Sequence, residues 1–238
     1  MNPITTKQYV RATVRKRKTD KTDAEVIARV ALQGEGTLVT EETFGPTKPI
    51  LRTSMKLTGI AQILQLMQQR FESILPEESE LSEQLTLCRQ RLETAVAVYR
   101  KRAVELTNKE LEQLLCSIPG IGTTIAVMLI AEIGDISRFK GPKALVAFAG
   151  LDPKVRQSGY TLQRNTRLTK RGSAYLRKSI YIAVTIAQRW NPDMKVTFDR
   201  KRAEGKRYKE ASIVIARRLL NCVYAVWSTN APYRQPKA

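Results

Sequence analysis

Two long stretches of helical periodicity, over about residues 51–74 and 79–106, constrain the fold of this chain most strongly. The apolar residues expected on one side of the first stretch are Leu57, Ile60, Ile63, Leu64, Met67 and Phe71. Those expected to point inward from the second are Leu81, Leu85, Leu87, Leu92, Val96 and Val98. Pro76 interrupts the pattern, and a short Pro-Glu-Glu turn joins the stretches. We therefore predict an antiparallel coiled-coil hairpin that acts as a spacer or dimerisation arm.

Shorter helical patterns occupy the sequence on both sides of this hairpin. Before it, one helix is expected over about residues 19–32, followed by a linker over 37–50 that is rich in Gly and Pro. After it, periodicity and breaking residues predict further helices over 109–116, 123–133, 173–190, 193–204 and 209–227. The stretch between the second and third of these is expected to be a mixed loop region. The fold class is therefore predicted to be mainly α.

The charge of the chain narrows the classes of function. It carries 41 Lys and Arg against 22 Asp and Glu, a formal net charge of +19. Such a surplus makes an anionic polymer the expected partner. The sequence contains no histidine, which excludes a Ser-His-Asp triad. A serine nucleophile would depend on a metal-bound oxygen, a lysine or an arginine environment, which favours phosphodiester chemistry on nucleic acid.

The cysteines and the hydropathy pattern indicate the compartment. Cys88, Cys116 and Cys222 are far apart and odd in number, and no Cys/His spacing suggests zinc. No stretch reaches eighteen uninterrupted apolar residues, and the N-terminus is basic and polar. We therefore expect a cytoplasmic protein that neither spans a membrane nor carries a signal for export.

A Pro-Gly-Ile-Gly turn separates two of the predicted helices at residues 119–122. This turn is typical of a helix-hairpin-helix, in which glycines let the backbone approach a phosphate and the second helix presents free N–H groups. Gly120, Gly122 and Thr123 are therefore candidate contacts to a DNA backbone. The alternative is a tight turn that serves only to pack the two helices.

The segment 138–178 carries a dense positive charge. It contains eleven cations and one acid, Asp152, a net charge of +10 over 41 residues. Ordinary solvated surfaces mix the two signs, so this density predicts a face that binds a nucleic-acid backbone around Ser158. Tyr160 and Tyr175 are weaker candidates for stacking on bases. The other candidate contacts of this segment are Lys154, Arg156, Gln157, Arg164, Arg167, Lys170, Arg171, Arg177 and Lys178.

Three residues have both a structural and a chemical interpretation. Ser158 precedes Gly159, which is ordinary turn chemistry, but its hydroxyl could also act as a nucleophile. Asp20 and Asp23 can cap the start of a helix. Because they lie three residues apart they also share a helix face, where two carboxylates could bind Mg²⁺. The residues alone leave these alternatives open.

A series of motifs resembles one known family over nearly the whole chain, from Asn2 to about Tyr224. The motifs are KTDKTDAEVIARVA, a helical hairpin, SIPGIGTTIAVMLIAEIGDISRF, AFAGLDP, QSG and TKRGSAYLRK, in this order. The chain resembles the transposases of the bacterial insertion-sequence one-ten family, which are related to pilin-gene-inverting recombinases. This resemblance implies a residual RuvC-like segment over residues 1–50, a coiled-coil hairpin over 51–107 and a C-terminal transposase domain over 108–238.

The resemblance also implies roles for individual residues. Asp20 and Asp23 would be the last two acids of a four-acid Mg²⁺ site, and Ser158 would attack DNA and form a covalent phosphoserine link. Family members act as homo-oligomers, dimers or tetramers, and some use a structured guide RNA. DNA is therefore the expected partner and Mg²⁺ the expected cofactor.

The start of the chain departs from the family pattern. Only nineteen residues precede Asp20, and none is Asp or Glu. The first two acids and most of the RuvC-like sheet are therefore expected to be missing, through a truncated gene copy, a start at an internal Met, or a partner chain that supplies them.

The expected function is DNA transposition by strand exchange through Ser158. The alternative is a catalytically inactive, truncated transposase that acts only as a DNA- or RNA-binding protein. A helix-hairpin-helix repair glycosylase or lyase is disfavoured, because no Lys/Asp pair occurs where such enzymes need one.

Overall fold

A computed structural model describes residues 28, 32, 45–74, 79–153, 157–158, 161–162 and 168–235 of this chain. The chain divides into two units, Met1–Thr43 and Phe44–Ala238. Of the first unit, Ala28 and Leu32 are described, and both are helical, in agreement with the helix predicted there. Everything that follows concerns the second unit.

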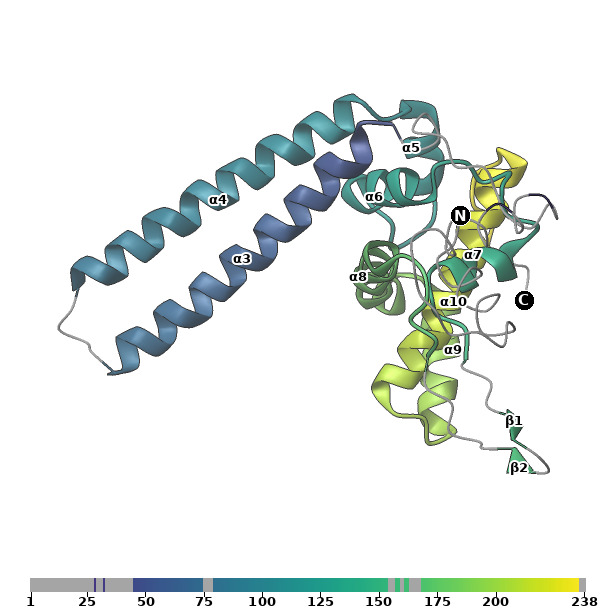
Figure 1. The fold of residues 1–238 in the computed structure, drawn as a ribbon. Helices are drawn as coiled ribbons and strands as arrows, with labels where there is room; N and C mark the ends of the chain where they lie inside the picture. The colour runs from purple at the N-terminus through teal and green to yellow at the C-terminus, as the bar shows by residue number, and fades with distance from the viewer. Residues whose placement is uncertain are drawn as a thin grey trace. The chain divides into compact units, whose positions relative to one another are not determined.

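Two long helices form an arm (Figure 1). Helix α3 spans Thr47–Ile74, and α4 spans Ser79–Glu105. They run antiparallel, because Gln68 Nε2 donates hydrogen bonds to Ser82 and Thr86 near the far end. The predicted linker over 37–50 was wrong at its end, since α3 begins four residues earlier than expected. Pro49 does not prevent this because it lies in the first turn, where a helix tolerates proline.

The predicted inward face of the arm was wrong for six of its twelve residues. Half or more of Ile63, Met67 and Val98 is exposed to solvent, and Ile60, Leu81 and Leu87 are exposed as well. The face of α3 that lies against α4 alternates steps of three and four residues. Its members are Ser54, Leu57, Ala61, Leu64, Gln68 and Phe71. Small and polar residues thus share the seam with three large apolar ones.

The described residues of the C-terminal part form six shorter helices (Figure 1). They are α5 (Lys109–Cys116), α6 (Thr123–Ile133), α7 (Pro142–Phe148), α8 (Ala174–Trp190), α9 (Pro192–Ala203) and α10 (Tyr208–Thr229). Asn108, Ser173 and Asn191 cap α5, α8 and α9, because each side-chain oxygen accepts a hydrogen bond from a backbone N–H in the first turn. Helix α7 was not predicted, since its seven residues are too few to show a period.

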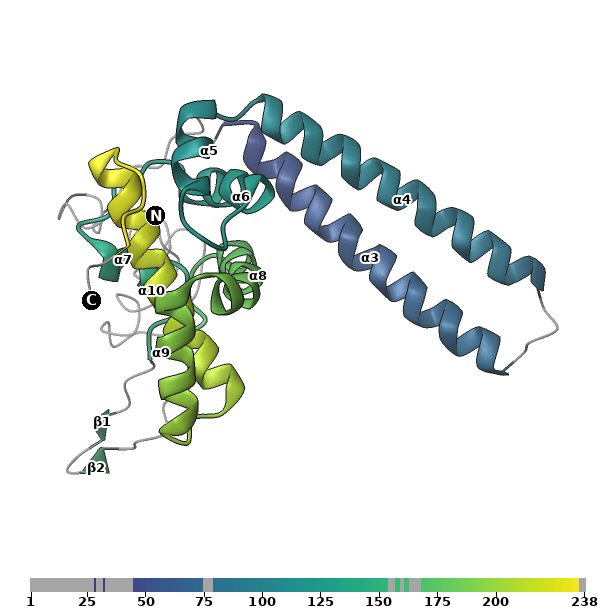
Figure 2. The ribbon, with the colours of Figure 1, turned by 180° about the vertical axis from the view of Figure 1, so that it is seen from behind.

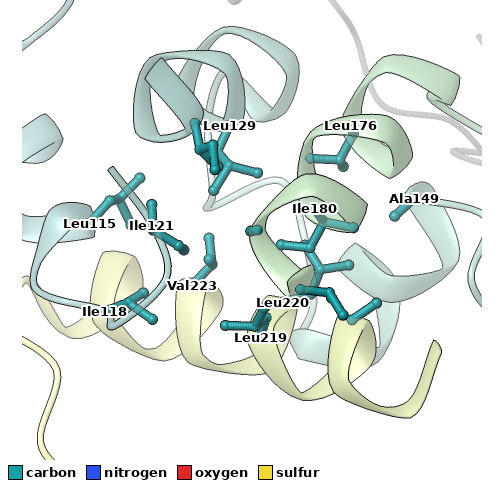
Figure 3. Close-up of a cluster of buried hydrophobic side chains, with 14 of the residues drawn as sticks. Leu115, Ile118, Ile121, Leu129, Ala149, Leu176, Ile180, Leu219, Leu220 and Val223 are labelled. Carbon is teal, nitrogen blue, oxygen red and sulfur yellow. The ribbon is translucent and has the colours of Figure 1, made fainter. Parts of the chain in front are cut away.

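The core of this part lies where α6, α8 and α10 meet the turn after α5 (Figure 3). Its fully buried members include Ile118 in that turn, Leu129 on α6, Ile180 on α8 and Leu219 on α10. Helix α6 is apolar all round because a second cluster covers its other side: Leu51 and Met55 of α3 pack there against Val127, Met128 and Ala131. The arm is therefore anchored on α6.

The prediction of a mainly helical protein is confirmed for the described residues. Besides the helices, these residues contain one pair of two-residue strands. The RuvC-like segment, the coiled-coil winding of the arm and a DNA-binding role for the helix-hairpin-helix stay predictions. No helix among the described residues is both long and apolar enough to cross a membrane.

Candidate nucleic-acid interface

The turn between α5 and α6 contains the two glycines of the predicted phosphate-binding motif. Gly120 has a φ of +103°, and a Cβ atom there would lie 2.7 Å from Cβ of Ala187 on α8. Gly122 is the N-cap of α6 in an extended conformation, and a Cβ atom there would meet nothing within 4 Å. Gly120 is thus needed to pack the turn against α8, whereas Gly122 leaves space beside the start of α6.

Thr123 opens α6 and is exposed. Burial raises the pKa of the Cys116 thiol, and a side-chain hydrogen bond with Thr123 offsets part of that rise. No side chain caps α6 at Gly122, so the first N–H groups of this helix are available to an anion. A phosphate contact through Gly122 and Thr123 stays a prediction.

Ser158 lies on a short β-hairpin. Strand β1 (Gln157–Ser158) pairs antiparallel with β2 (Thr161–Leu162), and Ser158 is opposite Thr161. Pro153 and Leu168 form an antiparallel bridge at the other end of the hairpin. The pairing places the backbone of Ser158 at the end of the hairpin that is remote from this bridge.

The chain is held firmly where the hairpin begins and ends. We call residues 148–152 and 169–173 the hairpin base. Each of the five carbonyl oxygens of residues 148–152 accepts a hydrogen bond. Three of the donors are backbone N–H groups of the returning segment, at Thr169, Lys170 and Ser173. These bonds therefore join the segment before the hairpin to the segment after it.

Two arginines from different helices donate hydrogen bonds to the hairpin base. Arg177 on α8 donates from Nη1 to the Ala149 carbonyl at 2.9 Å. Arg217 on α10 donates from Nε to the Leu151 carbonyl at 2.8 Å. Both side chains are half-buried, and each uses one of its five N–H groups in these bonds. Arg177 therefore has a structural role besides the DNA contact predicted for it.

Two glycines let the segments of the hairpin base come into contact. Gly150 has a φ of +66°, and a Cβ atom there would collide with the carbonyl oxygen of Arg171. Gly172 has a φ of +99°, and a Cβ atom there would collide with the carbonyl oxygen of Phe148. The sequence motifs AFAGLDP and TKRGSAYLRK thus meet in space, and their glycines are sterically required.

The structure divides the predicted cationic contacts into three groups. Lys170, Arg171 and Lys178 are exposed around the hairpin base and the start of α8. Arg177 is half-buried. The third group lies outside the described part of the chain and consists of Lys154, Arg156, Arg164 and Arg167. Asp20 and Asp23 also lie outside it, and of Gln157 only the backbone is described. The exposed group brings positive charge to the place where the hairpin leaves the helices.

Arg138 of the same basic segment has a structural environment. Its guanidinium group lies 4.6 Å from the ring centre of Phe139 and 4.5 Å from that of Phe148. Burial lowers the pKa of Arg138, and Asp135 and Glu132 oppose this shift. Stacking of this kind stabilises the segment before α7 against Phe148 at the end of α7. Not every cation of segment 138–178 is therefore free to bind nucleic acid.

Glu132 connects the arm to the hairpin base. It is 4% exposed, and its carboxylate accepts hydrogen bonds from Arg52 of α3 and from Ser173 Oγ at 2.7 Å. Burial raises the pKa of Glu132, but the hydrogen bonds from Arg52 and Ser173 outweigh burial and hold it below its ordinary value. Arg52 also lies over the ring of Tyr175, 4.7 Å from its centre.

Sequence reasoning missed three of these residues: Arg52, Glu132 and Arg217. The available signal for two of them was a charged residue inside an apolar helix, as in TTIAVMLIAEI for Glu132 and SIVIARRLLN for Arg217. A buried charge needs a partner. The sequence, however, does not say which distant residue supplies it.

The predicted magnesium ligands cannot be placed from this structure, because Asp20 and Asp23 lie outside the described residues. Among the residues that are described, no group of three or more His, Cys, Asp or Glu side chains is arranged to hold a metal ion. The Mg²⁺ site therefore stays a prediction that rests on the resemblance.

Residues 112–198 match the family model described as Transposase IS116/IS110/IS902 family. This range includes most of α5, all of α6 to α8, the hairpin base and Ser158. The candidate nucleophile and the backbone hydrogen bonds of the hairpin base thus lie together within the matched region, whereas Arg217 lies beyond it.

Several proteins of insertion elements are similar to this chain. An uncharacterized 42 kDa protein of insertion element IS900 from Mycobacterium paratuberculosis is 34% identical over 122 residues, which cover 51% of this chain and 30% of that protein. The pilin gene-inverting protein of Moraxella bovis is 35% identical over 121 residues, 50% of this chain and 38% of that protein. The transposase for insertion sequence element IS1111A from Coxiella burnetii is 26% identical over 136 residues, 56% of this chain and 37% of that protein. This chain thus matches about a third of the length of these relatives.

Proposed function

We propose that this chain, a member of the transposase IS116/IS110/IS902 family through its residues 112–198, breaks and rejoins DNA strands with Ser158 as the nucleophile. The observation that carries the proposal is the hairpin base. Five consecutive carbonyls of the matched region accept hydrogen bonds next to the hairpin of Ser158, and two of the donors are Arg177 and, from beyond the matched region, Arg217. A nucleophile must be positioned closely against its target, and a hairpin fixed at its base supports such positioning.

The proposed chemistry is a transesterification. Oγ of Ser158 attacks the phosphorus of a DNA phosphodiester, and the bond between that phosphorus and the leaving strand's oxygen breaks. The proton of Ser158 is lost and the leaving oxygen becomes a hydroxyl. The phosphoserine link stores the bond, so that a hydroxyl of another strand can reverse the step and complete an exchange. The chain has no histidine to take the proton, which leaves water, lysine or a metal-bound oxygen.

The exposed cations near the hairpin base serve this chemistry by binding the DNA backbone. Lys170, Arg171 and Lys178 can neutralise phosphates on either side of the attacked bond. Gly122 and Thr123 are proposed to hold a further phosphate at the start of α6.

Further parts of the proposal rest on the family. Asp20 and Asp23 would hold Mg²⁺, which supplies electrostatic stabilisation of phosphate oxygens when bound. A second copy of the chain would be needed to exchange two pairs of strands. A structured guide RNA would select the target where the element encodes one.

Covalent capture tests the proposal. The chain is incubated with Mg²⁺ and DNA that carries the joined ends of the element, with the guide RNA where one is found, and resolved on a denaturing gel. We expect a protein–DNA adduct that is lost in Ser158→Ala and kept in Ser228→Ala, which alters an exposed serine at the end of α10. An adduct that persists in Ser158→Ala would exclude this nucleophile. Binding without any adduct would point to the nucleic-acid-binding alternative.

A further inference from the structure

The turn between α9 and α10 is a concentrated basic surface to which the sequence analysis assigned no role. We call residues 199–209 the basic turn. Six of these eleven residues are cations: Arg200, Lys201, Arg202, Lys206, Arg207 and Lys209. The basic turn lies beyond residue 198, where the match to the family model ends. Figure 2 shows it at the end of α10 that is opposite to α5.

Two of these cations shape the turn itself. Lys201 pairs with Glu204 at 2.7 Å, and Arg202 Nη1 donates to the Lys206 carbonyl at 2.7 Å. Gly205, with a φ of +81°, reverses the chain between them, and a Cβ atom there would meet nothing within 4 Å. The turn is therefore fixed from within and open toward solvent.

The remaining four cations are not held in close ion pairs within the described part of the chain. No salt bridge engages Arg200, Lys206, Arg207 or Lys209 there. The hydrogen bond with Lys201 lowers the pKa of Glu204, and the charges of Arg200 and Lys206 add to this shift. With six cations against the two acids Asp199 and Glu204, the basic turn keeps a net charge of +4 for an external anion.

Helix electrostatics explain only part of this charge. Arg200, Lys201 and Arg202 lie in the last turn of α9, where cations stabilise the negative helix end. Lys206, Arg207 and Lys209 lie just before α10 or in its first turn, where the positive helix end disfavours them. Arg207 occupies the N-cap position and makes no side-chain cap hydrogen bond. The stability of the fold therefore does not account for these three cations.

The only aromatic residue of the basic turn, Tyr208, is 48% exposed but already has partners within the fold. The hydroxyl of Tyr208 is bonded to Gln188, and its ring meets Phe198 edge to face with ring centres 5.4 Å apart. Unpaired strands are usually bound by stacking on free aromatic rings. Six cations beside one ring that is engaged in this way favour contact with backbone phosphates, which a duplex presents regularly.

We infer that the basic turn is a second DNA-binding surface, which holds the backbone of duplex DNA without reading its sequence. It is separate from the surface around the hairpin base. This inference rests on the proposed function in so far as DNA is the partner.

The test compares two quadruple variants. Arg200→Gln, Lys206→Gln, Arg207→Gln and Lys209→Gln together remove the four charges without a salt bridge. The matched control is Lys56→Gln, Arg70→Gln, Arg91→Gln and Lys101→Gln, which removes two arginines and two lysines from exposed positions of α3 and α4. Both variants take four charges from the net +19, and both should unfold at nearly the wild-type temperature.

The probe is a fluorescent 30-base-pair duplex of arbitrary sequence, titrated at several salt concentrations. We expect the turn variant to bind at least about tenfold more weakly, with a slope of log K against log salt that is shallower by about 2 to 4. The control variant should keep a slope within about 1 of the wild type. Equal slopes for the wild type and the turn variant would overturn the inference. It would also be overturned if the turn variant lost more affinity for a single strand of the same length than for the duplex. Failure of the wild type to bind any DNA would overturn the proposed function as well.

Discussion

Arg52 of α3 and Glu132 of α6 form a two-bond ion pair, with Nε to Oε1 at 2.7 Å and Nη2 to Oε2 at 2.9 Å. The same carboxylate accepts a hydrogen bond from Ser173, the N-cap of α8 and the last residue of the hairpin base. One buried acid thus joins the arm, the core and the segment that carries Ser158. A movement of the arm against α6 would therefore disturb the hydrogen bond between Glu132 and Ser173 at the hairpin base.

Glu132→Gln should destabilise the protein strongly. The change removes the negative charge that compensates Arg52 and Lys48 in a largely buried place, and such losses cost about 2–4 kcal/mol of unfolding free energy. Urea denaturation followed by circular dichroism measures this. Glu105→Gln is the control, because it breaks an exposed pair with Arg102 and should cost less than about 1 kcal/mol. Equal effects of the two substitutions would contradict the role given to Glu132.

The lowered pKa of Lys48 should make the stability of the protein depend on pH in the alkaline range. Burial lowers its pKa from 10.5 to about 8, although Glu132 pulls it upward. Between these two values the unfolded chain holds a proton that the folded chain has lost, so the unfolding free energy rises with pH. Below about pH 8 both states hold the proton and the contribution is flat. Lys48→Gln should therefore remove a rise between pH 8 and 10 that Lys56→Gln, on the same helix, leaves in place. A rise of equal size in all three proteins would contradict this assignment.

The two glycines of the α5–α6 turn should respond differently to the same substitution. Gly120→Ala places a methyl group 2.7 Å from Ala187 at a positive φ, which should cost about 2–4 kcal/mol of stability. Gly122→Ala has free space and should change stability by less than about 1 kcal/mol. If Gly122 approaches a phosphate, its alanine variant should instead weaken DNA binding. Thermal unfolding and DNA titration of both variants separate packing from binding.

The helices of the C-terminal part could be predicted from sequence because their ends are marked locally. Asn108 and Ser173 cap helices at or next to the predicted starts, and α6 ends at Gly134 as its pattern requires. The seam of the arm could not be predicted by size, because Ala61 and Gln68 take inward positions while Ile63 lies outside. There, hydrogen bonds from Gln68 to α4 replace apolar contact.

The candidate site was only partly visible in the sequence. The motifs predicted Ser158 and the cations near it, because a serine can act as a nucleophile and cations can bind phosphates. The bonds that hold the hairpin depend on the carbonyl oxygens of residues 148–152, which carry no sequence signal. Arg217 reaches one of them from α10, which begins 46 residues after the end of β2, and only the fold reveals that pairing.

Arg217→Ala should separate strand cleavage from DNA binding. Loss of its bond to the Leu151 carbonyl loosens the hairpin base, and small errors in positioning reduce reaction rates by about tenfold or more. Affinity for duplex DNA should change by less than about threefold. Arg217→Lys, which can still donate to that carbonyl, should recover part of the rate. Arg218→Ala is the control, since Arg218 bonds Thr197 of α9 and does not touch the hairpin base. If Arg217→Ala and Arg218→Ala both lowered the rate and the affinity together, Arg217 would act only through general stability.

The most direct test of the account is to locate the covalent bond to DNA. The adduct formed with the element's DNA is digested with nuclease and protease, and mass spectrometry identifies the residue that retains a nucleotide. The account predicts a nucleotide phosphate on Ser158. A nucleotide on any other residue, with Ser158 unmodified, would contradict it.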